Sequence, residues 1–551
     1  MQVPRIADDK LVRHFRQILL WPLQLMPIRE DSQIQNHWEL LETGGADNPW
    51  REVADEFAEP GGFQERHYNE LVTFLPYVQR FLYGEGRARV AGPETGASPM
   101  RVFRRNDVAA VRITSQAGES PLTLKVAHVD LYFFYDIDVV LLKVEVHTEN
   151  LSLYQAQDML YRFGRAYPAG WDEHGRGLHC MERVEWLGAE GDVLAQSDAE
   201  RRDEFLSFVC RHRAPRISSH WAYLLQPLIL DHSTEQGVIR YRQLEYYRMP
   251  VMAYLAVENP RALSRSDLIR LGWVAMPGTD ESLPYSDRHV ADFEQRYCYD
   301  RFWTDSVEGP ASRYMCCGHA LVVVGEGRSP YFINPETGVL AQFRHQHFLL
   351  FLIAHLQKAS LLMFSDRLVD ALNKLVVHNP ESVKRFKRAI RQHFEIFLRF
   401  THRYWFHQIA DHAQTKALFH LCAQHLGTDK LYQDVKERIH DMNAYLDSDS
   451  LRRQANTVVR LTVVTTFGLI GTVVTGFLGM NLLAEADSPF AQKVLYFALV
   501  LIPVTLLTLY TILRSKRLSD FLEALSDERL PARSKIDSLM DVWRKKRKFG
   551  E

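Results

Sequence analysis

Two long runs without a charged residue lie near the C-terminus of this 551-residue chain. The first lies between Arg460 and Glu485, and the second lies between Lys493 and Arg514. About 20 helical residues cross a hydrocarbon core of about 30 Å, so each run is long enough to span a membrane. The longest apolar stretch elsewhere, Phe348 to Leu356, is too short and is interpreted as a buried helix. The sequence therefore predicts two transmembrane helices behind a large polar body.

The charges that flank the two runs predict how the helices are oriented. Basic residues flank the pair on both outer sides, with Arg460 before the first run and Arg514 after the second. The connection, residues 482–492, contains Glu485 and Asp487 but no Lys or Arg. Because basic flanks stay in the cytoplasm, we expect an outer loop and two cytoplasmic termini.

Composition excludes several other classes of protein. Charged residues make up 24% of the chain, and the formal net charge is only -2, so no charge excess indicates nucleic-acid binding. The mean hydropathy of -0.23 fits a soluble body with a small membrane part. The six cysteines are scattered, which is typical of a reducing compartment. The apolar stretch from Ile18 to Ile28 is short and broken by Pro22, so we interpret it as a core or interfacial segment and not a signal peptide.

The two uncharged runs differ in chemistry. The second is rich in Leu and Val, whereas the first is rich in Thr and Gly. Spacings of three and four place several of its Thr and Gly residues on one helical face. These residues either pack helix against helix or line a pore, which would need a ring of subunits because two spans enclose little space. The candidate pore-lining residues are Val458, Leu461, Thr462, Thr465, Leu469, Thr472 and Gly476.

The tripeptide Gly479-Met480-Asn481 ends the first run, on the predicted outer side. In residues, side and position it resembles the signature of the CorA-type divalent-cation channel family. The resemblance covers roughly residues 427–517. It implies a homopentamer in the cell (inner) membrane, with an α+β or α/β cytoplasmic funnel domain, a long stalk helix and two transmembrane helices.

The resemblance also implies a selectivity filter at Gly479, Met480 and Asn481. A ring of Asn481 amide oxygens would accept hydrogen bonds from hydrated Mg²⁺, which loses its water reluctantly. Glu485 and Asp487 would concentrate cations at the outer mouth. Leu461 and Val458 would form apolar rings that gate the pore. Transport down the electrochemical gradient needs no nucleotide, and the Gly325-Glu326-Gly327 stretch lacks the features of a phosphate-binding loop.

A long stalk helix is predicted from Asp429 to Gly479. Apolar residues from Leu431 to Leu446 recur at helical spacing, and no proline lies between Asp429 and Pro489. Two helices with a bend near residues 447–449 are the alternative. Carboxylates on a pentameric stalk would repel one another, and bound Mg²⁺ would relieve this repulsion. The candidate regulatory metal ligands are Asp434, Glu437, Asp441, Asp447 and Asp449.

The remaining chain is expected to form a mixed α/β body. Residues 1–98 are interpreted as mainly helical, 99–380 as the α/β domain and 381–426 as a helical hairpin. Residues 427–481 would form the stalk and first span, 493–513 the second span and 514–551 a basic cytoplasmic tail. The predicted strands are 102–114, 122–135, 139–146, 321–324 and 331–333, and the predicted helices are 151–163, 343–372, 382–402 and 414–426.

Two other polar motifs are interpreted as structural. Asp136 and Asp138 flank a strand turn and are expected to form that turn, with a regulatory cation site as the alternative. The sequence Cys316-Cys317-Gly318-His319 lacks the paired spacing of a zinc site, so we expect core residues there. Neither a catalytic triad nor a nucleotide-binding motif can be identified from residue order, so an enzyme is not expected.

The sequence leaves alternatives open within the transporter hypothesis. Mg²⁺ is the favoured ion, but Zn²⁺, Co²⁺ or Ni²⁺ would suit the same architecture. A membrane-tethered cytoplasmic sensor or enzyme without ion flux is a different class, and it predicts that Asn481 is dispensable. The expected partners are further copies of the chain, the lipid bilayer and divalent cations, with no nucleic acid.

Overall fold

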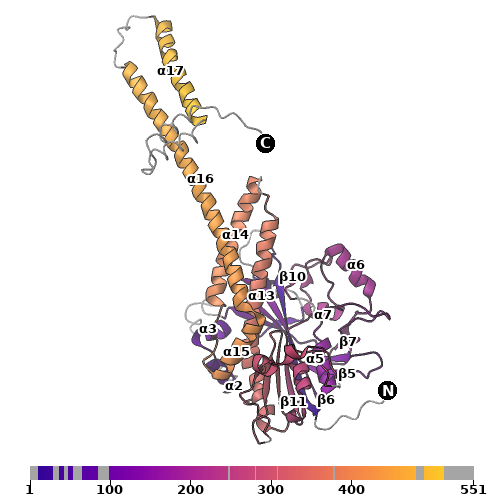
Figure 1. Ribbon diagram of the computed structural model, residues 1–551. Helices are drawn as coiled ribbons and strands as arrows, with labels where there is room; N and C mark the ends of the chain where they lie inside the picture. Colours follow the sequence, from indigo (N-terminus) through magenta and orange to yellow (C-terminus); the bar gives the residue numbers. More distant parts are fainter. Residues whose placement is uncertain are drawn as a thin grey trace. The chain divides into compact units, whose positions relative to one another are not determined.

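The computed structural model divides the chain into two units, Met1–Ile439 and His440–Glu551. The residues that it describes are 10–28, 36–42, 48–53, 65–84, 98–245, 248–278, 281–306, 308–376, 379–479 and 489–513. Figure 1 shows the elements of both units.

The first unit is built on a 14-stranded mixed sheet. Its main path runs β12-β13-β14-β11-β1-β6-β5-β4-β7-β8, while β10 pairs with β1 and β9, and β3 pairs with β2 and β5. The strands are β1 (Leu11–Leu25), β2 (Trp50–Glu52), β3 (Met100–Arg105), β4 (Ala110–Thr114), β5 (Leu122–Phe134), β6 (Ile137–Ser152), β7 (Arg183–Leu187), β8 (Val193–Gln196), β9 (Ile229–Leu230), β10 (Arg240–Gln243), β11 (Val251–Val257), β12 (Cys298–Tyr299), β13 (Arg313–Cys316) and β14 (Ala320–Glu326).

Helices cover this sheet and continue into the second unit. They are α1 (His37–Glu42), α2 (Glu65–Thr73), α3 (Pro76–Tyr83), α5 (Leu153–Arg162), α6 (Arg202–His212), α7 (Ser219–Leu225), α8 (Arg265–Gly272), α9 (Asp287–Val290), α10 (Phe293–Tyr297), α11 (Pro330–Ile333), α12 (Val339–Arg344), α13 (Gln346–Asn373), α14 (Pro380–Arg403), α15 (Ala413–Leu426), α16 (Thr428–Gly479) and α17 (Phe490–Leu513). A mixed α/β body followed by a long helix is the architecture that the sequence predicts.

The prediction of a mainly helical N-terminal region is wrong for β1. This strand lies inside the sheet, where it pairs with β6 along nearly its whole length and with β11 along its first half. Pro22, which has no N–H to donate, lies where β1 changes partner from β11 to β10. From Gln17 to Leu25 both faces of β1 are buried, and residues 18–23 form a continuous apolar run without the alternation that marks a half-exposed strand.

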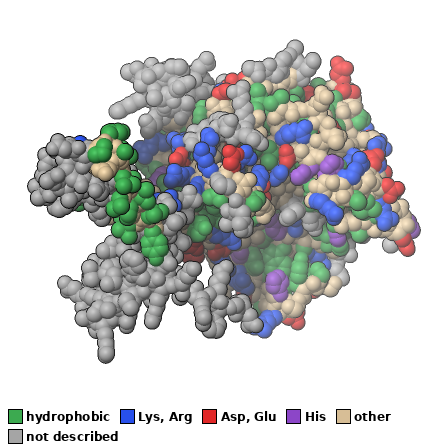
Figure 2. Space-filling model, turned by 90° about the horizontal axis from the view of Figure 1, so that it is seen from above, with side chains coloured by type: hydrophobic (Ala, Val, Ile, Leu, Met, Phe, Trp, Pro, Cys, Tyr) green, Lys and Arg blue, Asp and Glu red, His purple; other side chains and the backbone are tan. Residues whose placement is uncertain are grey.

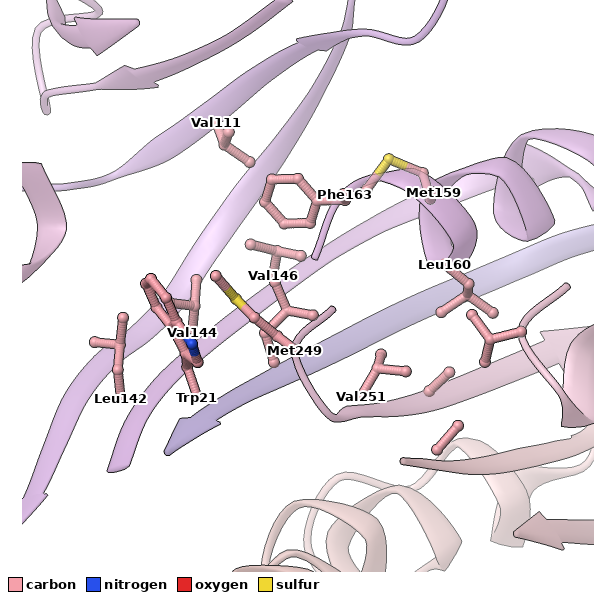
Figure 3. Close-up of a cluster of buried hydrophobic side chains, with 14 of the residues drawn as sticks. Trp21, Val111, Leu142, Val144, Val146, Met159, Leu160, Phe163, Met249 and Val251 are labelled. Carbon is pink, nitrogen blue, oxygen red and sulfur yellow. The ribbon is translucent and has the colours of Figure 1, made fainter. Parts of the chain in front are cut away.

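One face of the sheet packs against α5, α7 and α8. Figure 3 shows Met159, Leu160 and Phe163 of this region together with Trp21 and Val146 from the strands. The Phe163 ring lies 5.5 Å from the Trp221 ring, so aromatic side chains extend this apolar layer to α7.

The opposite face packs against α12 and α13. The Phe348 ring of α13 lies 5.7 Å from the Tyr132 ring of β5, and the Phe343 ring of α12 lies 5.7 Å from the Tyr254 ring of β11. The sheet is therefore covered on both sides. Helix α13 in turn contacts α14 and α15, which lead to α16 (Figure 1).

Two local predictions are wrong for identifiable reasons. The strand predicted for residues 102–114 is two strands, β3 and β4, separated by a turn at Asn106 and Asp107. Residues 331–333, predicted as a strand, belong to helix α11. The Ser329 side chain caps this helix by accepting a hydrogen bond from the Phe332 N–H, and Pro330 occupies its first turn.

Candidate pore-lining helix

Helix α16 begins inside the first unit and continues without interruption through residue 479. Gly427, with φ of 66°, ends α15 in the left-handed region and allows the chain to turn into α16. Its first turns are anchored by packing, because the Tyr432 ring stacks 4.3 Å from Trp405 and 5.7 Å from Phe397. Val435 and Ile439 are also buried. The alternative of a bend near residues 447–449 is wrong, since the helix runs through them.

Seven residues of α16 form a narrow stripe along its membrane-predicted part. Successive helix residues are about 100° apart, which places all seven within a stripe about 100° wide. The α16 stripe consists of Val458, Leu461, Thr462, Thr465, Leu469, Thr472 and Gly476. Its large apolar members are strongly exposed, with Val458 at 61%, Leu461 at 63% and Leu469 at 67%. The stripe has therefore no partner within the described part of one chain.

The opposite side of the same stretch behaves differently. Val463 is only 8% exposed, and it is the one buried residue between 457 and 479 among those whose side chains are described. Val463 is displaced by about 140° from Val458 around the helix. The buried Val463 side chain thus lies away from the α16 stripe, whose described side chains are exposed, although Arg460 and Val464 are exposed as well.

The threonine hydroxyls of the stripe all donate to backbone carbonyls of their own helix. Thr462 donates to Val458 at 2.9 Å, Thr465 to Leu461 at 2.9 Å and Thr472 to Gly468 at 2.8 Å. A hydroxyl has one proton and two acceptor lone pairs. With the proton used in the helix, each exposed oxygen can only accept hydrogen bonds. The hydrogen atoms of water around a cation supply such bonds.

Packing among the described residues does not require the glycines of this helix. An added Cβ at Gly468, Gly471, Gly476 or Gly479 would meet no described atom within 4 Å. Glycine costs about 1 kcal/mol in a helix interior relative to alanine. Close approach of another helix is the ordinary use of small residues in membranes, so this pattern favours a partner outside the described chain.

Helix α17 also exposes most of those apolar side chains that the structure describes. Phe490 is 81% exposed, Leu499 65% and Leu506 61%, and Pro503 lies inside the helix. Figure 2 shows hydrophobic side chains gathered on the described parts of α16 and α17, whereas the surface of the body is mixed in character. Contiguous apolar surface of this kind marks a membrane or protein contact.

Length and composition alone single out a different helical stretch. Val339–Asn373 is apolar enough to cross a membrane, but 83% of its most apolar window is buried inside the protein, as in a core helix. The prediction of a buried helix around Phe348 to Leu356 is thus confirmed, although α13 is longer than that stretch, at 28 residues. Among the described residues, 457–469 form a shorter apolar segment, so two spans and two cytoplasmic termini stay predictions.

The predicted filter and outer mouth lie mostly outside the described residues. Gly479 is the last residue of α16, and Met480, Asn481, Glu485 and Asp487 follow it in residues that the structure does not describe. The basic tail, 514–551, also lies outside them.

The structure places the stalk carboxylates on the surface of α16. Asp434, Glu437 and Asp441 are exposed at spacings of three and four, on the side away from buried Val435 and Ile439. Asp447 is exposed on another side, and Asp449 lies in the same helix. Over the ranges that the structure describes, no three His, Cys, Asp or Glu residues are grouped to hold a metal ion.

The Asp136–Asp138 segment forms the turn between β5 and β6. Asp136 has φ of 64° and forms ion pairs with Arg399 at 3.1 Å and Arg403 at 2.7 Å. Asp138 forms an ion pair with Arg367. The structural interpretation of this segment agrees with these contacts, because the carboxylates neutralise arginines of α13 and α14.

The Cys316–His319 segment is also built into the core. Burial lowers the pKa of His319 to about 3 and raises the pKa of Cys317 to about 12. Both groups are therefore neutral near pH 7. Cys316 and Cys422 are fully buried and free. These properties fit core residues, as the sequence predicts.

A buried ionic cluster lies on the α13 side of the sheet and was not predicted from the sequence. Glu145 of β6 pairs with Lys143 at 3.0 Å, with Arg344 of α12 at 3.1 Å and with Arg16 of β1. Burial by itself would raise the pKa of Glu145, but these cations outweigh burial and hold that pKa well below its usual range. The sequence pattern that could have indicated this cluster is the alternation of Lys143 and Glu145 with valines. The cluster attaches α12 to the centre of the sheet.

Comparison with known proteins agrees with the C-terminal architecture. Residues 354–516 match the family described as CorA-like Mg2+ transporter protein. No curated protein matches the chain. The matched part begins within α13 and includes α14 to α17, so it extends further upstream than the resemblance from residue 427 indicates. The C-terminal part of this chain, residues 354–516, is thus similar to the CorA-like Mg2+ transporter family.

Proposed function

We propose that this protein is a divalent-cation channel that moves Mg²⁺ into the cytoplasm through a pentameric pore. The observation that carries the proposal is the α16 stripe, which is open in one chain and presents hydroxyl oxygens only as acceptors. From Val458 to Gly479 the helix rises by about 32 Å, enough to cross the hydrocarbon core. Five copies would surround an oxygen-lined path without dehydrating the ion.

The ends of this path have different roles in the proposal. Gly479 and Met480 end the path, and Asn481 follows them in the sequence. Asn481 would form the amide ring that selects a hydrated divalent ion. At the other end, Val458 and Leu461 would close the path by excluding water from an apolar constriction. The membrane potential supplies about 4.6 kcal/mol per 100 mV for a doubly charged ion, so no nucleotide is needed.

The exposed stalk carboxylates would report the internal Mg²⁺ concentration. Asp434, Glu437 and Asp441 share one face of α16 and belong to no group of three metal-ligating side chains among the described residues. In a ring of five stalks their charges would repel, and Mg²⁺ between subunits would hold the stalks together and the pore closed. This feedback rests on the pentamer.

Flux measurements in liposomes test the function. We expect Mg²⁺ uptake by the wild-type chain and its loss in Asn481→Ala, with uptake retained in Gln433→Ala, which removes an exposed amide elsewhere on α16. Zn²⁺, Co²⁺ and Ni²⁺ are measured in parallel. Zinc uptake without magnesium uptake would show that the channel transports Zn²⁺ and not Mg²⁺. Absence of flux for every ion would favour a membrane-tethered sensor instead, and full activity of Asn481→Ala would contradict the amide ring.

A further inference from the structure

A cavity lies at one end of the sheet in the first unit, away from α16 and α17. Its volume is about 310 Å³, at the lower end of the range for small-molecule sites. Segments from β13, β14, α11, α12 and α15 surround it. The lining residues are Phe302, Gly309, Pro310, Ala311, Ser312, Tyr314, Glu326, Ser329, Tyr331, Phe332, Val339, Gln342 and Gln414.

Aromatic side chains provide most of the large surfaces of this cavity. Tyr314 and Phe332 are each 2% exposed, whereas Tyr331 is 58% exposed and Phe302 is 37% exposed. Two rings therefore lie deep and two lie where solvent enters. The Phe332 ring needs Gly325 beneath it, because an added Cβ at Gly325 would lie 2.2 Å from the ring. The backbone thus accommodates this aromatic wall.

The charge of the lining is negative. Glu326 is its one charged residue, and neither Lys nor Arg is among the lining residues. Within the described ranges the Glu326 carboxylate forms no ion pair, although carboxylates elsewhere in this unit, such as Asp300, are paired with arginines. The guanidinium of exposed Arg301 lies 5.8 Å from the Phe302 ring, and the Arg261 guanidinium donates to the carbonyl of Gly309, a lining residue.

A buried amide completes the polar part of the site. Gln414 of α15 is 6% exposed, and its Nε2 makes no hydrogen bond within the described part of the chain. Gln414 lies beside the Tyr314 hydroxyl. An amide nitrogen has two protons to donate, so one bound group or water with an acceptor atom would remove the cost of leaving this donor unpaired.

We propose that this cavity binds a small organic cation, with an alkylammonium group held against the faces of Tyr314 and Tyr331 and paired with Glu326. Aromatic faces attract cations, most strongly when the cation is only weakly hydrated. A divalent metal ion fits poorly, since it requires several oxygen ligands and the cavity offers one carboxylate. The proposal is independent of the transport function, because none of the lining residues belongs to α16 or α17.

Choline and its neutral isostere 3,3-dimethyl-1-butanol are the probes for this site. The two molecules have nearly the same shape and differ in the positive charge. We expect calorimetric titration of the detergent-solubilised full chain to show choline binding in the millimolar range or tighter. The neutral isostere should bind about tenfold more weakly, the ratio expected for a cation–π contact with an ion pair. Equal binding of both would overturn the proposal in favour of a merely apolar pocket.

Variants at two positions separate the carboxylate from the aromatic face. Glu326→Gln should weaken choline binding about tenfold and leave binding of the neutral isostere unchanged. Tyr331→Leu should weaken choline binding, whereas Tyr331→Phe, which keeps the ring, should retain it. The matched control is Glu336→Gln, an exposed carboxylate outside the lining, and it should bind choline as the wild type does.

Each outcome decides the proposal. Tyr331 is exposed and Glu326→Gln keeps the side-chain shape, so these variants should fold, and an unchanged thermal unfolding midpoint verifies this. Choline binding that is unaffected by Glu326→Gln, or no choline binding by the wild type, would overturn the site. Loss of binding in Glu336→Gln as well would show a general charge effect and would overturn it equally.

Discussion

A threonine in a membrane helix can satisfy its hydroxyl proton locally, and on α16 each threonine of the stripe does so. Thr472 donates to the Gly468 carbonyl at 2.8 Å, and off the stripe Thr466 donates to the Thr462 carbonyl at 2.8 Å. Hydrogen bonding within the helix therefore does not distinguish the threonines of the stripe from Thr466. What differs is the direction in which the remaining acceptor lone pairs face.

Thr472→Val tests whether those lone pairs serve the ion. Valine keeps the shape and removes the oxygen, so we expect Mg²⁺ flux in liposomes to fall by about tenfold, the value of roughly one hydrogen bond. Thr466→Val is the control and should retain flux. Equal loss in both variants would indicate a packing role for the threonines.

Buried histidines make the body sensitive to acid. Burial of His220 on α7 lowers its pKa to about 3, so the folded state favours the neutral ring. Unfolded histidine has a pKa of about 6.5. The stability from this difference is complete above about pH 6.5 and is lost as the pH falls from there towards about 3.

His220→Gln should reduce this sensitivity. From pH 7 to about pH 5, we expect the wild type to lose about 2 kcal/mol of unfolding free energy more than the variant loses. Denaturant unfolding of the solubilised chain at the two pH values measures the difference. The exposed His174→Gln variant should follow the wild type. Identical pH dependence of His220→Gln and the wild type would contradict the assignment.

At the scale of elements, α16 combines two surfaces with different purposes. Its first turns bury Tyr432, Val435 and Ile439 against the body, whereas the α16 stripe and the glycines near it contact nothing described. A helix of this kind is stabilised locally at one end and depends on further partners at the other. Substitutions along it should therefore affect different properties of the protein.

Gly476→Leu separates assembly from folding. An added Cβ at Gly476 meets no atom within 4 Å, so we expect the thermal stability of the body to stay unchanged while oligomer and flux are lost. Cross-linking in detergent and liposome flux give the two readouts. Gly325→Ala should do the opposite, because its Cβ would lie 2.2 Å from Phe332 inside the body. An intact oligomer in Gly476→Leu would argue against close helix contact at this position.

The elements also differ in how well their sequences predict them. Helix α5 begins with Ser152 and Gln155 in a capping box, and the predicted helix 151–163 matches it closely. The second half of strand β1 gives no comparable signal, because its alternation disappears where both faces are buried. The predicted strand at residues 331–333 is a helix because the cap at Ser329 and Pro330 outweighs the β preference of its aromatic residues.

For the whole molecule, one chain leaves its transport part incomplete. Among the residues that the structure describes, the α16 stripe is exposed and the stalk carboxylates belong to no group of three metal-ligating side chains. Symmetric association of identical subunits would supply both at once. The body, by contrast, has its own sheet and a core covered on both faces.

Native mass spectrometry of the detergent-solubilised chain should show five copies of the 64.0 kDa subunit. Removal of Mg²⁺ with a chelator should loosen the stalks and increase hydrogen exchange in the stalk peptide that contains Asp441. A monomer at concentrations that support flux would contradict the pore. Hydrogen exchange that is insensitive to Mg²⁺ would contradict the proposed feedback by internal Mg²⁺ but not the proposed pore.

Features that depend on local composition could be predicted from the sequence. They are the two uncharged runs, the stripe at spacings of three and four, the long proline-free helix and the Asp136 turn, and each depends on neighbouring residues. The central position of β1, the ionic cluster around Glu145 and the cavity beside Glu326 became visible only in the folded structure. Each of these joins residues that are distant in the sequence, such as Arg16 with Glu145 or Tyr314 with Gln414. Burial and pairing across such distances follow from chain topology, which local periodicity does not encode.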